Sequence, residues 1–136
     1  MLMKEPVKAI LYADDDPDDL ALFREAVTAL GEQYYIIEAM DGIHALELLR
    51  QMQESNELPC LIVLDINMPR LDGKQTLVAL QNHPLFSSIP VVLFSTSSSV
   101  LDKTFSQSKK VELITKPFDF KTLYDIAGKL LSYCNV

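Results

Sequence analysis

The stretch LIVLDINMPRLDG, residues 61–73, decides the fold of this chain. It begins as an unbroken apolar run of strand length, which is typical of a parallel sheet whose two faces are both covered by helices. Asp65 stands where this run stops, and Pro69 with Asp72-Gly73 predicts a loop in which Asp72-Gly73 forms a turn. Because ligands gather at the carboxyl ends of parallel strands, we expect Asp65 to lie at a functional edge.

The same alternation of strand and helix continues outward in both directions. Strands are expected at residues 7–13, 34–39, 61–64, 91–94 and 111–115, and helices at 17–30, 43–53, 73–82, from 100 onward and at 120–133. Asp16 can cap the first helix, because Pro17 suits a first helical position. Five strands alternating with five helices predict one α/β domain, a doubly wound parallel sheet with helices on both faces.

Composition excludes several classes of protein. The 136 residues fit one domain, and the formal charge of -7 without a Lys/Arg-rich run argues against direct binding of nucleic acid. A leader peptide and a long apolar run are both missing from the sequence, so we expect no membrane insertion and a cytoplasmic location. Cys60 and Cys134 lack C-x-x-C spacing, and we expect two separate thiols rather than a zinc site or a disulfide.

Reactive side chains follow most of the expected strands. Asp14 and Asp15 come after the first strand, Asp65 after the third, Ser95 after the fourth and Lys116 after the fifth. Parallel strands end at one edge, so these groups are expected to converge. Clustered carboxylates repel one another, and a divalent cation that prefers oxygen ligands, Mg²⁺ above all, relieves that repulsion. With a lysine and a hydroxyl nearby, such a site suits transfer of a phosphoryl group onto Asp65.

Four motifs carry a resemblance to a known family. They are YADDDP at 12–17, LDINMPRLDG at 64–73, PVVLFS at 90–95 and TKPF at 115–118. The chain resembles the receiver domain of two-component response regulators across essentially its full length, and most closely the stand-alone kind typified by the bacterial chemotaxis regulator. The resemblance implies a flavodoxin-like (βα)5 fold with strand order 2-1-3-4-5, and residues 1–136 as a single receiver domain with no output domain.

The resemblance also implies roles for the acidic residues. Asp65 would be the phosphoacceptor. Asp14 and Asp15 would hold Mg²⁺ beside Asp65, directly or through water, and Asn67 would lend its backbone carbonyl to the metal. Taken alone, the acidic run would be a helix cap.

Further roles follow from the last two motifs. Lys116 would pair with the phosphoryl group, and the Lys116-Pro117 bond would be cis as in the family. Ser95 would be the switch hydroxyl, although a register slip of one residue would make it Thr96. The chain departs from the family at Leu113, where Tyr or Phe is common, so the path from the site to an output surface is left unassigned.

The function implied is a phosphorylation switch. A histidine kinase or histidine phosphotransfer protein would donate a phosphoryl group to Asp65, and the output would be binding to an unknown downstream protein or phosphorelay. The chain would catalyse only its own phosphorylation and dephosphorylation. A homodimer through the fourth helix, fifth strand and fifth helix is left open.

Three other functions compete with this switch. The first is a constitutive, phosphorylation-independent interaction module. The second is an aspartate-nucleophile phosphohydrolase, which would carry an acid where this chain has Asn67. The third is a flavin-binding domain of the same topology, but the acidic residues 14–16 would repel its phosphate.

Overall fold

The computed structural model describes residues 7–135, which form one parallel sheet flanked by helices. The strands are β1 (Lys8–Ala13), β2 (Tyr34–Ala39), β3 (Leu61–Asp65), β4 (Val91–Ser95) and β5 (Glu112–Thr115). The helices are α1 (Pro17–Leu30), α2 (Gly42–Glu54), α3 (Gly73–Gln81), α4 (Val100–Lys109) and α5 (Phe120–Leu130), followed by the 3₁₀ helix η1 (Leu131–Cys134). The strand order is β2-β1-β3-β4-β5, so the predicted doubly wound fold is confirmed.

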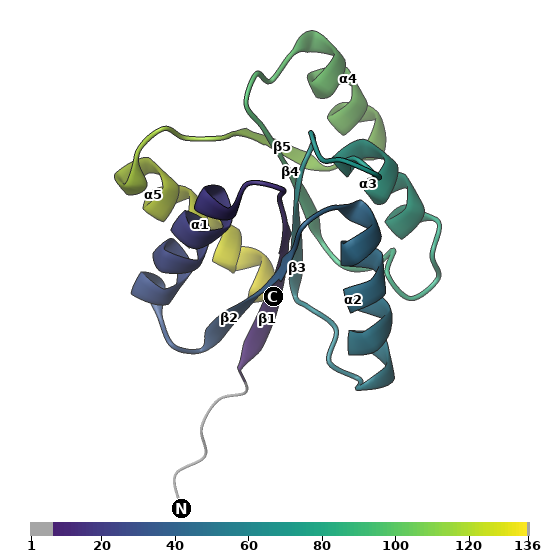
Figure 1. Cartoon of the computed structure of the whole chain (residues 1–136), viewed down its shortest axis with the longest axis horizontal. Coiled ribbons are helices and arrows are strands. Elements are labelled where there is room, and N and C mark those ends of the chain that lie inside the picture. The colour runs from purple at the N-terminus through teal and green to yellow at the C-terminus, as the bar shows by residue number, and fades with distance from the viewer. Residues whose placement is uncertain (1–6, 136) are drawn as a thin grey trace, which may run out of the picture.

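Helices cover both faces of the sheet, with α1 and α5 on one side and α2, α3 and α4 on the other (Figure 1). The α1 and α5 side holds an aromatic cluster in which the rings of Tyr12, Phe23 and Phe94 lie 4.7 to 6.1 Å apart. The opposite side is mostly aliphatic, with Leu64 and Leu77 among its fully buried residues. Burial on both faces explains why the central strand reads as a continuous apolar run. Among the helices of residues 7–135, none is both long and apolar enough to cross a membrane.

Strand register brings the functional side chains to one edge. Ala13 pairs with Leu64, so Asp14 and Asp65 are the next residues on adjacent strands. Ser95 pairs with Thr115, and the backbone N–H of Lys116 donates to the Ser95 carbonyl at 2.8 Å. The convergence expected from topology is therefore built by parallel pairing, which keeps equivalent residues level across the sheet.

The predicted turn at Asp72-Gly73 is wrong, because these residues begin α3. The Asp72 carboxylate accepts a hydrogen bond from the Gln75 N–H at 2.8 Å, and the Gln75 side chain accepts from the Asp72 N–H at 3.0 Å, which together form a capping box. Gly73 is required by close approach: a Cβ there would lie 2.3 Å from the Asp65 carbonyl oxygen. The helix therefore starts directly against the backbone of Asp65.

The prediction of two separate thiols is also wrong, because Cys60 and Cys134 form a disulfide. Cys60 precedes β3, and its N–H donates to the Ala9 carbonyl at 2.9 Å, while η1 carries Cys134 back under the same end of the sheet. The Lys8 ammonium group donates to the Cys134 carbonyl oxygen and holds η1 in place. This pairing depends on tertiary packing, so it could not be predicted from the spacing of the two cysteines in the sequence.

Two glycine substitutions test the close contact between α3 and β3. We expect Gly73→Ala to lower the free energy of unfolding by about 1–3 kcal/mol, because the added methyl group overlaps backbone atoms that cannot move aside. Gly128→Ala is the matched control, since the nearest atom to its Cβ would be a Leu30 methyl carbon at 3.8 Å. It should raise stability by about 0.5–1 kcal/mol through helix propensity. Urea unfolding of both variants measures the difference, and equal effects would contradict the contact.

Reduction tests the disulfide. Protein purified without reductant should be lighter than the reduced chain by two hydrogen atoms in intact mass. Because the bond joins residues separated by 74 positions, reduction should lower the free energy of unfolding by up to about 4 kcal/mol. The double variant Cys60→Ser with Cys134→Ser should show no response to reductant. Two free thiols in the unreduced folded protein would rule the bond out.

Candidate functional site

Acidic side chains gather at the carboxyl edge of the sheet. Oxygen atoms from Asp14, Asp15 and Asp65 all lie within 4.8 Å of one another. Asp14 has none of its surface exposed and Asp65 only 4%, whereas Asp15 is exposed. A buried carboxylate is costly unless charge and hydrogen bonds compensate it, so the partners of these groups show how the site is built.

Asp14 is the most heavily bonded of the acidic residues. Its Oδ2 accepts hydrogen bonds from the Tyr12 hydroxyl at 2.6 Å and from the Lys116 ammonium at 2.7 Å. Its Oδ1 accepts from the Asp16 N–H at 3.0 Å. Burial, and next the negative charge of Asp14, raise the pKa of Tyr12, so its hydroxyl stays a donor. Both oxygens of this buried carboxylate are thus satisfied.

Lys116 lies among the carboxylates, and its ammonium nitrogen is closer to Asp14 and Asp19 than to Asp65. Its ammonium nitrogen is 2.7 Å from Asp14, 2.8 Å from Asp19 and 3.5 Å from Oδ1 of Asp65. Burial alone would lower the pKa of Lys116, but hydrogen bonds to Asp14 and Asp19 outweigh it and raise the pKa. Lys116 is therefore a permanent cation shared by several acids.

Asp65 is the least satisfied of these acids. Its Oδ1 is buried and has no hydrogen-bond partner among the described residues. Burial, and next the negative charge of Asp14, raise the pKa of Asp65 to about 7, against the opposing effect of Lys116 and the Asn67 N–H. A carboxyl group this poorly compensated is a candidate for chemistry rather than for stability.

The residues at this edge fit a hard divalent cation. The donor set is made of carboxylate oxygens, and the buried Oδ1 of Asp65 has no hydrogen-bond partner among residues 7–135, with the Lys116 ammonium 3.5 Å away. Asp15 makes no side-chain hydrogen bond within residues 7–135 and offers a carboxylate at the solvent side. Asn67, proposed from the sequence to lend its carbonyl, follows β3 and is exposed.

The two candidate hydroxyl groups differ in their surroundings. Ser95 is fully buried at the end of β4, whereas Thr96 is exposed. The Ser95 hydroxyl donates to Oδ2 of Asp102 at 2.8 Å, a bond that the sequence did not suggest. The Lys116-Pro117 peptide is trans, since residues 7–135 contain no cis bond, so the expectation of a cis bond is wrong.

Four residues of the site were missed from the sequence: Tyr12, Asp19, Lys74 and Asp102. Tyr12 reads as a core residue of β1, and Asp19 and Asp102 read as ordinary acids of a first helical turn. Asp102 is buried and pairs with Lys74 at 2.9 Å. Burial distinguishes Tyr12 and Asp102, whereas Asp19 and Lys74 are half-buried and are distinguished by their ion pairs with Lys116 and Asp102. Both burial and ion pairing are decided by tertiary packing.

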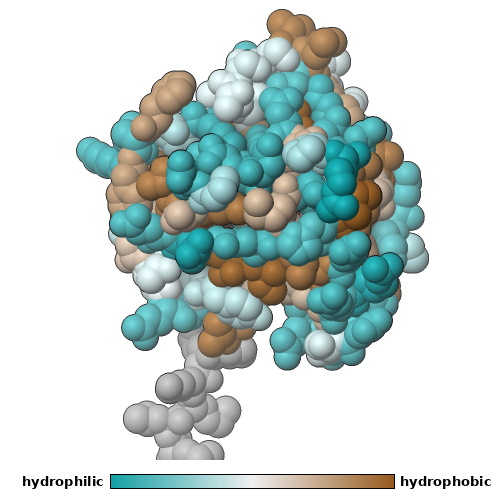
Figure 2. Space-filling model, in the orientation of Figure 1, coloured by the Kyte–Doolittle hydropathy of each residue, from teal (hydrophilic) through white to brown (hydrophobic). Residues whose placement is uncertain are grey.

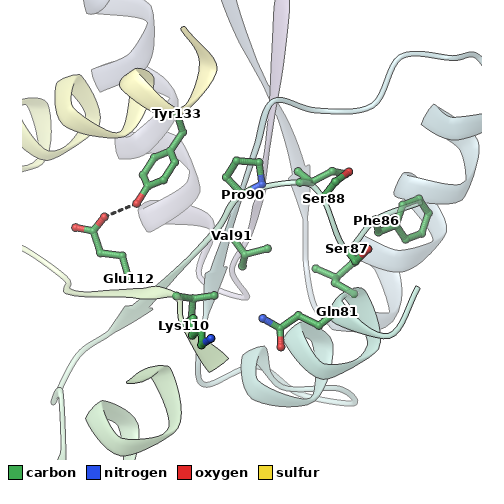
Figure 3. A pocket seen from close by; sticks show the side chains of 12 residues that line it. Gln81, Phe86, Ser87, Ser88, Pro90, Val91, Lys110, Glu112 and Tyr133 are labelled. Carbon is green, nitrogen blue, oxygen red and sulfur yellow. Dashed lines mark hydrogen bonds between the residues drawn. The ribbon is translucent and has the colours of Figure 1, made fainter. Parts of the chain in front are cut away.

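A pocket of about 260 Å³ lies elsewhere, near the starts of β4 and β5 (Figure 3). Its charged residues are Lys110 and Glu112, and the Glu112 carboxylate already accepts a hydrogen bond from the Tyr133 hydroxyl at 2.7 Å. The remaining lining residues are apolar or neutral polar. Ligands of α/β sheets gather at the opposite, carboxyl edge, so the acidic cluster is the better candidate site.

The chain is similar to known response regulators in sequence and in fold. Residues 10–127 match the family model described as response regulator receiver domain. The response regulator Rcp1 of Synechocystis sp. is 30% identical over 94% of this chain and 89% of its own length. A crystal structure of the phosphorylated cyanobacterial phytochrome response regulator RcpA is 30% identical, with a TM-score of 0.83 over 93% of this chain and 92% of that chain. The Mn²⁺-bound form of Rcp1 superposes with a TM-score of 0.78 at 29% identity, over 93% of this chain and 94% of that chain.

Some relatives are much longer. The sensor histidine kinase CheAY of Helicobacter pylori is 28% identical over 88% of this chain, which spans only 14% of that protein. The shared unit is thus one region of that longer protein, and the family match covers residues 10–127 of this chain. The chain belongs to the response regulator receiver domain family.

Proposed function

We propose that this protein is a phosphorylation switch in which Asp65 accepts a phosphoryl group from a histidine kinase or a histidine phosphotransfer protein. The observation that carries the proposal is the buried Oδ1 of Asp65, which has no hydrogen-bond partner within residues 7–135 and lies 3.5 Å from the Lys116 ammonium and beside Asp14 and Asp15. The crystal structure of phosphorylated RcpA, a protein 30% identical to this chain, supports it.

The transfer follows from the chemistry of Asp65. A carboxylate oxygen of Asp65 attacks the phosphorus atom of a phosphohistidine, and the P–N bond breaks with its electron pair going to the imidazole nitrogen. That nitrogen then takes up a proton. Asp65 must be ionised to attack, and Lys116 favours the ionised form. The product is an acyl phosphate on Asp65.

Charge at the site has to be balanced before a phosphoryl group can approach. Asp14, Asp15 and Asp65 would hold Mg²⁺ together with the backbone carbonyl of Asn67, and the bound ion would neutralise phosphoryl charge. Lys116 can swing from Asp14 and Asp19 toward the new phosphoryl oxygens, since it lies within 3.5 Å of Asp65 already. Ser95 would donate its hydroxyl proton to one of these oxygens.

Turnover of other phosphate compounds is not part of the proposal. An aspartate-nucleophile phosphohydrolase needs a general acid close to the nucleophile to protonate the leaving group. The amide of Asn67 cannot supply that proton. We propose that the chain catalyses only its own phosphorylation and dephosphorylation, and that it signals through an unidentified downstream protein.

Acetyl phosphate tests the proposal. In the presence of Mg²⁺ the protein should gain the mass of one phosphoryl group, and omission of Mg²⁺ should slow the gain at least about tenfold, because phosphoryl charge is then poorly neutralised. Intact-mass spectrometry over time measures both rates.

Two variants make the assignment to Asp65 specific. Asp65→Asn should show no gain in mass. Asp72→Asn is the matched control, because Asp72 lies in the same segment, and asparagine caps α3 as well as aspartate does. It should be phosphorylated like the unaltered protein. Equal gain in Asp65→Asn and the unaltered protein would disprove the assignment.

The raised pKa of Asp65 predicts how stability depends on pH without metal. The pKa is about 7 in the folded chain and near 3.9 when unfolded, so the folded state binds more protons. This contribution to stability is complete below about pH 4 and is lost as the pH rises through 7. At pH 8 without Mg²⁺, Asp65→Asn should therefore be more stable than the unaltered protein by about 1 kcal/mol or more.

Urea unfolding between pH 5 and 8.5 measures this difference. The gap between Asp65→Asn and the unaltered protein should grow with pH and shrink when Mg²⁺ is added. Asp125→Asn, at an exposed position of α5, should show no such growth. A gap that is constant over this pH range would contradict the raised pKa.

A further inference from the structure

The Ser95 hydroxyl has one proton, and that proton is already engaged. It is donated to Oδ2 of Asp102 at 2.8 Å, while the hydroxyl oxygen accepts from the backbone N–H groups of Ser97 at 3.3 Å and Ser98 at 2.8 Å. A serine hydroxyl is a single donor. Ser95 therefore cannot donate to a phosphoryl group on Asp65 and to Asp102 at the same time.

Asp102 joins three parts of the fold. It belongs to the first turn of α4, its Oδ2 binds Ser95 at the end of β4, and its Oδ1 pairs with Lys74 of α3 at 2.9 Å. It is only 7% exposed. Burial opposes ionisation of Asp102, but hydrogen bonds from Lys74 and Ser95 outweigh it and lower its pKa. Loss of either partner leaves a buried carboxylate under-satisfied.

Polar groups contribute much of the packing of α4 against the sheet. The buried residues of this helix are Asp102 and Ser106, and Phe105 is only partly buried. Val100 and Leu101 of its first turn are 78% and 77% exposed. Figure 2 shows hydrophobic residues standing out at the top of the molecule, above the position of α4 in Figure 1. With little apolar burial, the docking of this turn depends strongly on the bonds of Asp102.

The loop between β4 and α4 is tied to the same hydroxyl. Ser98 has a φ of 46°, a left-handed conformation that is unfavourable for most residues other than glycine. Its N–H is held by the Ser95 oxygen, and its side chain bonds to Thr115 at the end of β5. A rotation of the Ser95 side chain would release this strained residue as well.

We propose that Asp102 is a positioning residue that accepts the hydrogen bond of the Ser95 hydroxyl in the unphosphorylated state. When Asp65 carries a phosphoryl group, Ser95 donates to a phosphoryl oxygen instead, Asp102 loses this hydrogen bond, and the first turn of α4 loosens. The proposal rests on the proposed function, because it needs a phosphoryl group on Asp65. It assigns the coupling between the site and α4 to a polar relay that runs from Asp65 through Ser95 to Asp102. This chain has Leu113 at the position where Tyr or Phe is common in the family.

Hydrogen exchange measured by mass spectrometry tests the relay. The probe is beryllium fluoride with Mg²⁺, which mimics a phosphoryl group on a carboxylate, and fluorine NMR reports its binding. In the unaltered protein, amides of residues 100–106 should exchange about tenfold faster once the probe is bound, the change expected for loss of one hydrogen bond to a charged group. Amides of α2 should not change.

Variants separate a relay from a fixed anchor. In Asp102→Ala, α4 should exchange rapidly before the probe is added, and phosphorylation by acetyl phosphate should be at least about threefold faster, because the Ser95 proton is no longer engaged. Asp102→Asn keeps the size of the side chain and a weaker acceptor, so it should lie between the two. Ser95→Ala should bind the probe without any change in α4. Asp125→Ala should behave like the unaltered protein.

The outcomes distinguish this proposal from the proposed function. Bound fluoride with unchanged exchange of α4 would overturn the relay and leave phosphorylation of Asp65 intact. Unchanged phosphorylation rates in both Asp102 variants would overturn it as well, since a purely structural anchor has no effect on that rate. Absence of both fluoride binding and gain in mass would overturn the proposed function, and the relay with it.

Discussion

The burial of Asp14 is the constraint on which the rest of the site depends. A carboxylate with no exposed surface is tolerated only when donors and a positive charge surround it, and these come from Tyr12, the Asp16 N–H and Lys116. Lys116 follows β5, which is separated from β1 by β3 and β4. The ion pair therefore exists only when every strand between them is in place and in register. One lysine is shared by Asp14, Asp19 and Asp65, so negative charge remains in excess, and that excess is what makes the edge attractive to a cation.

The fold and the acidic edge could be predicted from the sequence because both follow from local patterns of apolar and polar residues. An apolar run marks a strand buried on both faces, and polar residues directly after such runs must meet when the strands are parallel, which is how Asp14, Asp65 and Lys116 could be named in advance. The failures concern groups whose role is decided by distant neighbours. Asp72 caps a helix instead of forming a turn, since Gly73 lies against the Asp65 carbonyl oxygen. The disulfide likewise arises because η1 is packed under the sheet, which no local pattern reports.

Two tasks, accepting a phosphoryl group and changing conformation, depend on different parts of the structure. The proposed acceptor chemistry depends on Asp65 and on the charges around it, whereas a switch needs an element with two arrangements of similar free energy. The α4 helix is suited to the second task because it buries little apolar surface and is held by the side chain of Asp102. Leu113 is partly buried on the mostly aliphatic side of the sheet, and its side chain has no polar group that could change hydrogen-bond partners. In the proposed switch, the Ser95 hydroxyl donates its single proton either to Asp102 or to a phosphoryl oxygen, and it cannot donate to both at once.

The disulfide between Cys60 and Cys134 divides the chain into an open segment and a covalently closed ring. The ring contains β3, β4 and β5, and therefore Asp65, Ser95 and Lys116, while Asp14 and Asp15 lie on the open segment outside it. A force applied to the two ends of the oxidised chain would extend the open segment but could not lengthen the ring. Mechanical load would thus separate Asp14 and Asp15 from Asp65 before it could pull Asp65 away from Lys116.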